Sequence, residues 1–281
     1  MTTANDTYVL GTAEAEPARL GRQHAIWRAD TVAAWDRAGY RAGQRLLDLG
    51  CGPGFAALDL AERVGAQGAV LAIDNAPAYL EHLEQQAQAR GLSQLTTRLL
   101  DLGSHACASP VAAPIGPGQW DGAWCRWLAM FLPDPGALVA FTAQALRPGG
   151  RLVLHEYVQW DTFALHPRGE GLERFVRRCI SHWQAHGGDP HVARRLPQLL
   201  EARGLRLLSA RSLMACEPTD GPKAQWLQDF LQSYPAQLAA AGVWSTADQL
   251  ALEADLAHAR RHPSLWVTPG LVEQIWEQPA A

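Results

Sequence analysis

The chain has 281 residues, of which 48% are hydrophobic and 19% are charged. This composition excludes an intrinsically disordered chain and suffices for a large buried core. The formal net charge of −4 indicates no basic surface for nucleic acid. No apolar run approaches the roughly 20 residues of a membrane helix, and residues 1–20 lack the pattern of a signal peptide. We therefore expect a cytoplasmic protein whose partners are neither nucleic acid nor membrane.

The first half of the chain alternates short apolar runs with helical patterns. Residues 1–44 carry apolar side chains near a 3.6-residue period, which predicts mostly helix, and residues 103–119 are rich in Ala, Pro, Ser and Gly, which predicts a loop. The expected strands are 45–50, 69–74, 95–100, 120–127 and 151–157, and the expected helices are 55–64, 78–90 and 135–146. Strands joined by helices at this spacing predict right-handed crossovers and a mostly parallel, helix-covered sheet.

The alternation loosens after residue 157. Helical patterns occupy 168–186, 190–203 and most of 227–259, and strand-like segments occupy 204–215 and 265–276. We expect those two strands to return to the same sheet, with the helices between them over its carboxyl edge. One domain with a helical cap is therefore favoured over two independent domains.

The segment Leu47–Gly54, LDLGCGPG, ends a strand and begins a helix. Its glycines allow tight turns and close approach of a ligand, and the helix start offers backbone amides. Asp74 ends the second strand 20 residues after Gly54, where a carboxylate can accept hydrogen bonds from both ribose hydroxyls. Asp101 follows the third strand and is a candidate partner for the exocyclic amine of adenine. The sequence thus predicts a nucleoside cofactor at this edge.

This ordered series resembles the class I S-adenosylmethionine-dependent methyltransferases, most closely the bacterial small-molecule members. The matching segments are RLLDLGCGPG, AIDNA, LLDLG, WDGAWCRWLAMFLPDP and ALRPGGRLVLHEY. The resemblance implies a Rossmann-like α/β fold, with a seven-stranded sheet parallel except for its last strand, helices on both faces and a helical cap. It divides the chain into an N-terminal helical lid at 1–44 and a methyltransferase domain at 45–281, with cap insertions at about 158–203 and 220–262.

The resemblance also implies S-adenosyl-L-methionine as the cofactor. The glycines of the loop would line its methionine portion, and Asp48 would orient the loop or contact the ammonium through water. Arg126 corresponds to a position near the carboxylate or the reaction face, with a surface salt bridge as the alternative. The expected cofactor-binding residues are Asp48, Gly50, Gly52, Gly54, Asp74, Asn75, Asp101, Leu102 and Arg126.

The acceptor is expected outside the carboxyl ends of the strands. His155 and Tyr157 at the end of the fifth strand are the candidate catalytic residues, with His155 as general base or as a packing residue, and Tyr157 as a hydrogen-bond donor. Aromatic side chains that would surround a planar or lipophilic acceptor are Tyr8, Trp27, Trp127, Trp160 and Trp183. Tyr8, Gln23 and His24 form a candidate lid over the cofactor. Metal-dependent members of the family need clustered acids, and the sequence shows no such cluster. We therefore expect no metal.

These observations favour in-line methyl transfer to a small aromatic or lipophilic metabolite, with O-methylation first and N- or C-methylation open. One alternative is a class I relative that performs other sulfonium chemistry. Another is a partner or regulator that binds the cofactor without catalysis. A nicotinamide-dependent dehydrogenase is disfavoured, because its G-x-G-x-x-G fingerprint requires glycine where Phe55 stands. The acceptor, the pathway and the oligomeric state, including a homodimer through the capping helices, stay open.

Overall fold

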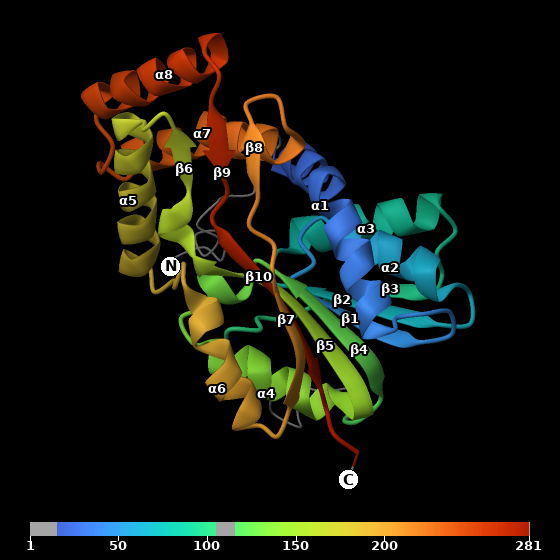
Figure 1. The fold of residues 1–281 in the computed structure, drawn as a ribbon. Coiled ribbons are helices and arrows are strands. Elements are labelled where there is room, and N and C mark those ends of the chain that lie inside the picture. Colours follow the sequence, from blue (N-terminus) through green and yellow to red (C-terminus); the bar gives the residue numbers. More distant parts are fainter. Residues whose placement is uncertain (1–15, 105–115, 281) are drawn as a thin grey trace, which may run out of the picture.

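The computed structural model describes residues 16–104 and 116–280, and Figure 1 shows a sheet with helices on both faces. The sheet has seven strands in the order β3-β2-β1-β4-β5-β10-β7. Their bounds are β1 Arg45–Leu49, β2 Ala69–Asp74, β3 Leu95–Leu99, β4 Trp120–Arg126, β5 Leu146–Gln159, β7 Arg206–Ser212 and β10 Gly270–Glu277. The first five are parallel, and β10 runs antiparallel to both β5 and β7. The predicted seven-stranded sheet with an antiparallel last strand is confirmed.

Two apolar cores lie on the two faces of this sheet. The helices α1 (Glu16–Ala38), α2 (Phe55–Val64) and α3 (Pro77–Ala89) pack on one face against side chains such as Leu46 and Val70. The helix α4 (Pro135–Ala145) packs on the other, against neighbouring residues such as Leu47 and Leu152. Successive side chains of a strand point to opposite faces. Because helices cover both faces of this sheet, inner strands such as β1 and β2 are nearly continuous apolar runs.

The cap lies beyond the carboxyl ends of the parallel strands (Figure 1). It consists of the helices α5 (Glu170–Ala185), α7 (Pro222–Ala240) and α8 (Thr246–Arg261), with a three-stranded sheet in the order β6-β9-β8. These strands are β6 Ala164–His166, β8 Cys216–Pro218 and β9 Leu265–Val267. The short helix α6 (Leu196–Glu201) instead packs near α4 and β7, so the end of the expected insertion at 158–203 covers the sheet and is not part of the cap.

The structure adds detail to two segments of the sequence expectation. The single strand expected at 265–276 is split at Thr268 and Pro269, and β9 joins the second sheet while β10 joins the first. Proline has no N–H to donate to a ladder, which explains the break. The segment 227–259, which we expected to be largely helical, contains parts of two helices, because Gly242 adopts a φ of +72° just after α7 and ends it. A capping box of Ser245 and Asp248 then begins α8.

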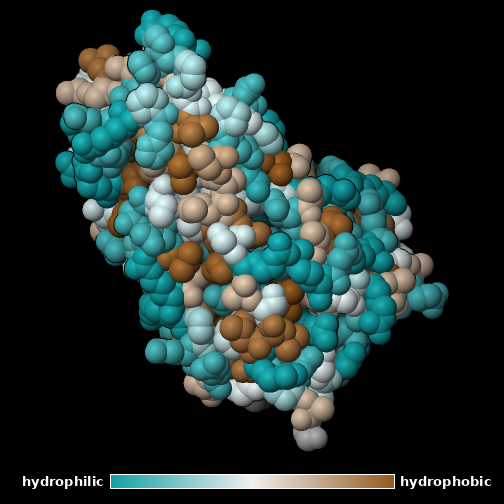
Figure 2. All heavy atoms as spheres, viewed as in Figure 1, coloured by the Kyte–Doolittle hydropathy of each residue, from teal (hydrophilic) through white to brown (hydrophobic). Residues whose placement is uncertain are grey.

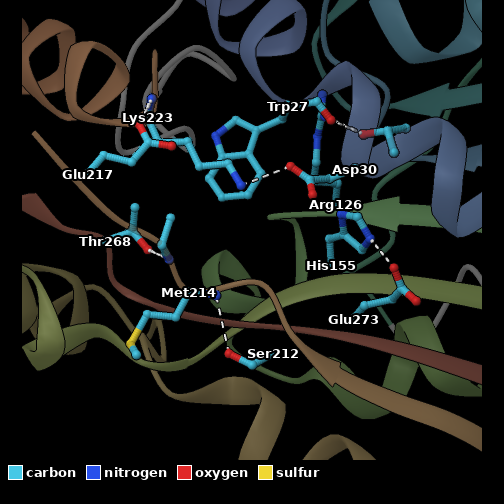
Figure 3. Close-up of polar contacts among 12 residues, drawn as sticks. Trp27, Asp30, Arg126, His155, Ser212, Met214, Glu217, Lys223, Thr268 and Glu273 are labelled. Carbon is cyan, nitrogen blue, oxygen red and sulfur yellow. Dashed lines mark hydrogen bonds and ion pairs between the residues drawn. The ribbon is translucent and has the colours of Figure 1, made fainter. Parts of the chain in front are cut away.

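Helix α1 connects the sheet to the cap. Lys223 of α7 pairs with Asp30 of α1 at 3.0 Å, and its ammonium lies 4.3 Å from the centre of the Trp27 ring, as Figure 3 shows. A second ion pair joins Arg22 to Asp229 at 3.0 Å. Segments that are about 200 residues apart in sequence therefore meet above the sheet.

The surface in Figure 2 is largely hydrophilic, with hydrophobic patches of limited size. Leu207 and Leu208 on the edge strand β7 are among the exposed apolar side chains. In the described ranges, the helices are all too short or too polar to cross a membrane.

Candidate active site

A cavity of about 320 Å³ lies at the carboxyl ends of β1, β2, β4 and β5, beneath α1 and α7. Its lining divides by chemistry. At one end lie the glycine loop and the carboxyl groups of Asp48, Asp74 and Asp101. At the other end lie aromatic rings from β4, β5, α5 and α7. The position agrees with the rule that open α/β sheets bind ligands outside the carboxyl ends of their strands.

The three glycines of the loop have different surroundings. All have positive φ, which disfavours any other residue. Gly50 and Gly52 line the cavity, and a Cβ atom on Gly52 would have nothing within 4 Å. Gly54 precedes α2 and is not a lining residue; a Cβ atom there would lie 2.3 Å from Leu83 of α3. Gly54 thus allows α2 and α3 to pack closely. The sequence predicted that Gly54 lines the cofactor site, but in the structure it does not line the cavity.

We expect Gly54→Ala to lower the free energy of unfolding by about 2 kcal/mol, from backbone strain and overpacking against Leu83. Gly52→Ala is the matched control, because Gly52 also has a positive φ but has open space around its Cβ position. This variant should lower the free energy of unfolding by about 1 kcal/mol. Urea denaturation of both variants measures the difference. Equal losses would show that the contact with Leu83 relaxes freely.

Asp74 ties the loop to the next strand. Its carboxylate accepts the Gly52 N–H at 2.8 Å and the Ala76 N–H at 3.0 Å, and burial raises its pKa. Asn75 and Asp101 also line the cavity, and Asp101 accepts the Gly103 N–H at 2.8 Å. Leu102 is buried and does not line it. Asp74, Asn75 and Asp101 therefore meet at one end, as the sequence predicted.

Asp48 is a buried acid at the inner wall. It is 2% exposed, and its Oδ2 atom has no hydrogen-bond partner among the described residues. Burial raises the pKa of Asp48 to about 7, against the opposing charge of Arg126. An unpartnered carboxyl oxygen this deep is costly, and a cationic ligand would stabilise its ionised form.

Arg126 ends β4 and also lines the cavity. Burial lowers its pKa to about 10, which leaves it charged at neutral pH. Its Nη1 donates to Thr31 Oγ1 at 3.1 Å, and its Nη2 lies 3.2 Å from Nδ1 of His24. A guanidinium only donates, so Nδ1 of His24 accepts, and Nε2 carries the proton directed at Asp59, 3.2 Å away. The surface salt bridge considered for Arg126 is absent among the described residues.

The other end of the cavity is an aromatic wall, defined here as Trp127, Tyr157, Trp160, Trp183, Trp226 and Phe230. Trp127 stacks on Tyr157 with ring centres 6.0 Å apart and on Trp226 at 5.5 Å. Trp160 meets Trp183 edge-on at 4.7 Å. Trp127 has a φ of +54°, unusual for a large side chain, which marks a constrained backbone at the end of β4.

His155 lies away from the cavity. It is 1% exposed, its Nε2 atom is 3.3 Å from Glu273 of β10, and its ring packs edge-on against Trp124 at 4.7 Å. His155 and Glu273 are paired in the β5–β10 register, which places their side chains together (Figure 3). The structure thus supports the packing alternative over the general base. Tyr157 does line the cavity, and burial raises its pKa, so it stays protonated and can donate.

Several lining residues were not predicted from the sequence. Arg19 and Leu20 of α1, Tyr79 of α3, and Trp226 and Phe230 of α7 face the cavity. Gln23, named only as a lid candidate, accepts a hydrogen bond from the Trp226 indole at 2.8 Å. Nothing in the helical pattern of α7 shows which of its rings turn inward.

Two predicted aromatic residues have other positions. Trp27 is fully buried and contacts Trp127 and Trp226 edge-on from α1, so it supports the wall without lining it. Tyr8 lies outside the described residues. Within the described ranges, there is no group of three or more His, Cys, Asp or Glu side chains that could hold a metal ion.

Comparisons with known proteins agree with this geometry. A family model described as "Methyltransferase domain" matches residues 46–150. The chain is 34% identical over 111 residues to an aklanonic acid methyltransferase from Streptomyces sp. (strain C5), covering 39% of this chain and 46% of that protein. It is 36% identical over 114 residues to a nocamycin O-methyltransferase from Saccharothrix syringae, covering 41% and 38%. These alignments span less than half of either relative.

A likeness in fold covers almost the whole chain. The structure of geranyl diphosphate C-methyltransferase from Streptomyces coelicolor A3(2) superposes with a TM-score of 0.60 at 16% identity, covering 98% of this chain and 90% of that one. The seven-stranded sheet, the glycine loop and the match at residues 46–150 lead to one conclusion. Residues 46–150 therefore form a methyltransferase domain, and the fold around it is that of the class I S-adenosylmethionine-dependent methyltransferases.

Proposed function

We propose that this protein transfers the methyl group of S-adenosyl-L-methionine to a small aromatic or otherwise lipophilic molecule. The observation that carries the proposal is that one cavity joins a nucleoside-type polar end to an aromatic wall. A polar end of this kind suits the cofactor, and apolar walls with few polar groups suit a lipophilic acceptor. The names of the two curated relatives, both of small-molecule methyltransferases, support the same class.

The residues of the polar end fit S-adenosylmethionine, which supplies a methyl group on a positively charged sulfur when bound. Gly50 and Gly52 would make room for its methionine portion. Each carboxylate oxygen of Asp74 accepts one backbone N–H and keeps capacity for a ribose hydroxyl. Asp101 would accept from the adenine amine. The unpartnered oxygen of Asp48 suits the positive charge of the ligand.

The rest of the chain would position the acceptor. We infer that residues 1–44 serve as a lid over residues 45–281, with α1 already in contact with α7. The segments at about 158–203 and 220–262 would select the acceptor through Trp160, Trp183 and Trp226. Rate enhancement would come from in-line placement and exclusion of water. We propose oxygen as the first candidate for the methylated atom, with nitrogen and carbon as alternatives. We also propose that the capping helices form a homodimer.

Calorimetric titration with S-adenosylmethionine and, separately, with NAD tests the cofactor. We expect micromolar binding of the first and none of the second. Formation of S-adenosylhomocysteine with a panel of aromatic acceptors then tests catalysis. Binding of the cofactor without turnover on any acceptor would favour a regulator that has lost catalysis. Absence of binding by folded, ligand-free protein would refute the proposal.

The affinity for S-adenosylmethionine should depend on pH through Asp48. Burial raises the pKa of this carboxyl to about 7, with Arg126 opposing and Asp74 adding to the shift. A cationic ligand favours the ionised form, so binding releases a proton, and affinity rises with pH until about 7. We expect about tenfold tighter binding at pH 7.0 than at pH 5.5, measured by calorimetry.

Asp48→Asn and the uncharged ligand adenosine serve as controls for this pH dependence. The variant keeps the shape of the side chain but cannot ionise, so most of the change between pH 5.5 and 7.0 should disappear. Adenosine carries neither sulfonium nor ammonium, and its affinity should change little. The same pH dependence in the wild type and in Asp48→Asn would contradict this role.

A further inference from the structure

The ionisable groups of the cavity are unevenly distributed. In the described part of the chain, its lining contains no His, Lys or Glu side chain. Its three carboxyls, Asp48, Asp74 and Asp101, all belong to the polar end, where the cofactor is proposed to lie. At the aromatic wall the ionisable side chain is Tyr157, whose raised pKa keeps its proton in place. Among residues 16–104 and 116–280, this end therefore offers no group that would take a proton from an acceptor at neutral pH.

A partly buried positive charge lines the cavity. The guanidinium carbon of Arg126 lies 5.0 Å from the centre of the Trp127 ring, so the charge borders the aromatic wall. Two of its nitrogens donate to the neutral acceptors Thr31 and His24. The described residues also place no carboxylate within ion-pair distance of Arg126. Asp48 acts on this charge through space without a direct ion pair, so the guanidinium can still donate to an anion in the cavity.

An acceptor that loses its proton in water needs no base from the protein. An aromatic carboxylic acid is ionised at neutral pH, its ring suits the aromatic wall, and its charge suits Arg126. The guanidinium would offset the cost of moving the carboxylate out of water. Resting on the methyltransferase function proposed above, we propose that the acceptor is a flat aromatic carboxylate, held by Arg126 and methylated on oxygen to give a methyl ester.

The chemical step balances without a proton transfer. A lone pair of one carboxylate oxygen forms a bond to the methyl carbon, and the bond from that carbon to sulfur breaks, with its electron pair remaining on sulfur. A negative and a positive reactant become a neutral ester and a neutral thioether group. Because charge disappears along the reaction, walls of low polarity such as Trp127 and Trp160 favour it over bulk water.

The test uses pairs of ligands that differ only in charge. Protein saturated with S-adenosylhomocysteine is titrated with benzoate, 2-naphthoate and anthracene-2-carboxylate, each beside its carboxamide. We expect at least one acid to bind tenfold or more tightly than its amide. In Arg126→Gln the preference should fall to near unity. Arg45→Gln, which removes an arginine over Trp120 at the opposite edge of the sheet, should keep it.

Equal affinities for every acid and amide, or binding of neither at any ring size, would overturn the carboxylate assignment. This comparison in the wild type stands even if Arg126→Gln fails to fold. Incubation with S-adenosylmethionine and detection of the methyl ester by mass spectrometry supply the second readout. Methylation of phenols or amines but not of acids would refute this inference and leave the proposed function intact, whereas failure to bind S-adenosylmethionine would refute the proposed function itself.

Discussion

Replacing Arg37 by methionine should lower the free energy of unfolding by about 3–5 kcal/mol, because it leaves a buried charge without its charged partner. The Glu273 side chain is 0% exposed, and Nε and Nη2 of Arg37 donate to its two oxygens. Burial alone would raise the pKa of Glu273, but hydrogen bonds from His155 and Arg37 lower it to about 2. Glu273 therefore stays ionised in the folded protein at neutral pH.

Urea denaturation at pH 7 measures this effect. The double variant Arg37→Met with Glu273→Gln removes the stranded charge and should recover most of the loss. Arg168→Met, which removes an exposed ion pair with Glu173, should cost less than about 1 kcal/mol. The contribution of Glu273 is present above its unfolded pKa of 4.5 and is lost as pH falls toward 2. A loss below 1 kcal/mol in Arg37→Met at pH 7 would contradict this account.

This network also explains why His155 could not be placed from the sequence. A histidine at a strand end is compatible with either a catalytic base or a packing residue, and its neighbours within the chain do not decide between them. The residue that decides is Glu273, 118 positions later, on the antiparallel strand β10. The sequence predicted that the last strand returns to the same sheet, but not the register that places these two side chains together.

The polar end of the cavity was largely predictable because its signals are local. The turn at Gly50 and Gly52 follows the short apolar strand β1, Asp74 ends the apolar strand β2, and Asp101 lies just after β3. The carboxyl ends of parallel strands meet at one edge, so order along the chain fixes their proximity. Gly54 shows the limit of such reasoning, since the same motif contains a glycine required for the contact of α2 with α3.

The aromatic wall was only partly predictable because it depends on contacts between distant segments. Trp127, Trp160 and Trp183 were expected there, whereas Trp226 and Phe230 of α7 were not singled out. Their direction follows from the packing of α7 on α1 and α5, through contacts such as Trp226 with Trp27. A helical period identifies an apolar stripe but not the element that it will face. The acceptor end of the site therefore required the structure.

Asp74→Ala should weaken the binding of S-adenosylmethionine by about 3 kcal/mol, or roughly 150-fold. Two effects add in the same direction. The variant loses charge-assisted hydrogen bonds to the ribose hydroxyls, each of which contributes about 1.5–3 kcal/mol. It also releases the Gly52 N–H, which Asp74 holds at 2.8 Å, so the loop must be ordered when the ligand binds. Calorimetric titration at pH 7.5 measures the affinity.

Three comparisons separate these two effects. Asp74→Asn keeps one oxygen for the Gly52 N–H but loses the charge and an acceptor, so its affinity should lie between wild type and Asp74→Ala. Asp220→Ala removes an exposed acid of the same charge and should bind normally. Adenine carries no ribose, so its weak binding should change less than that of the whole cofactor. If folded Asp74→Ala binds S-adenosylmethionine as tightly as the wild type, the ribose must be held elsewhere, and the polar end of the cavity would need a different assignment.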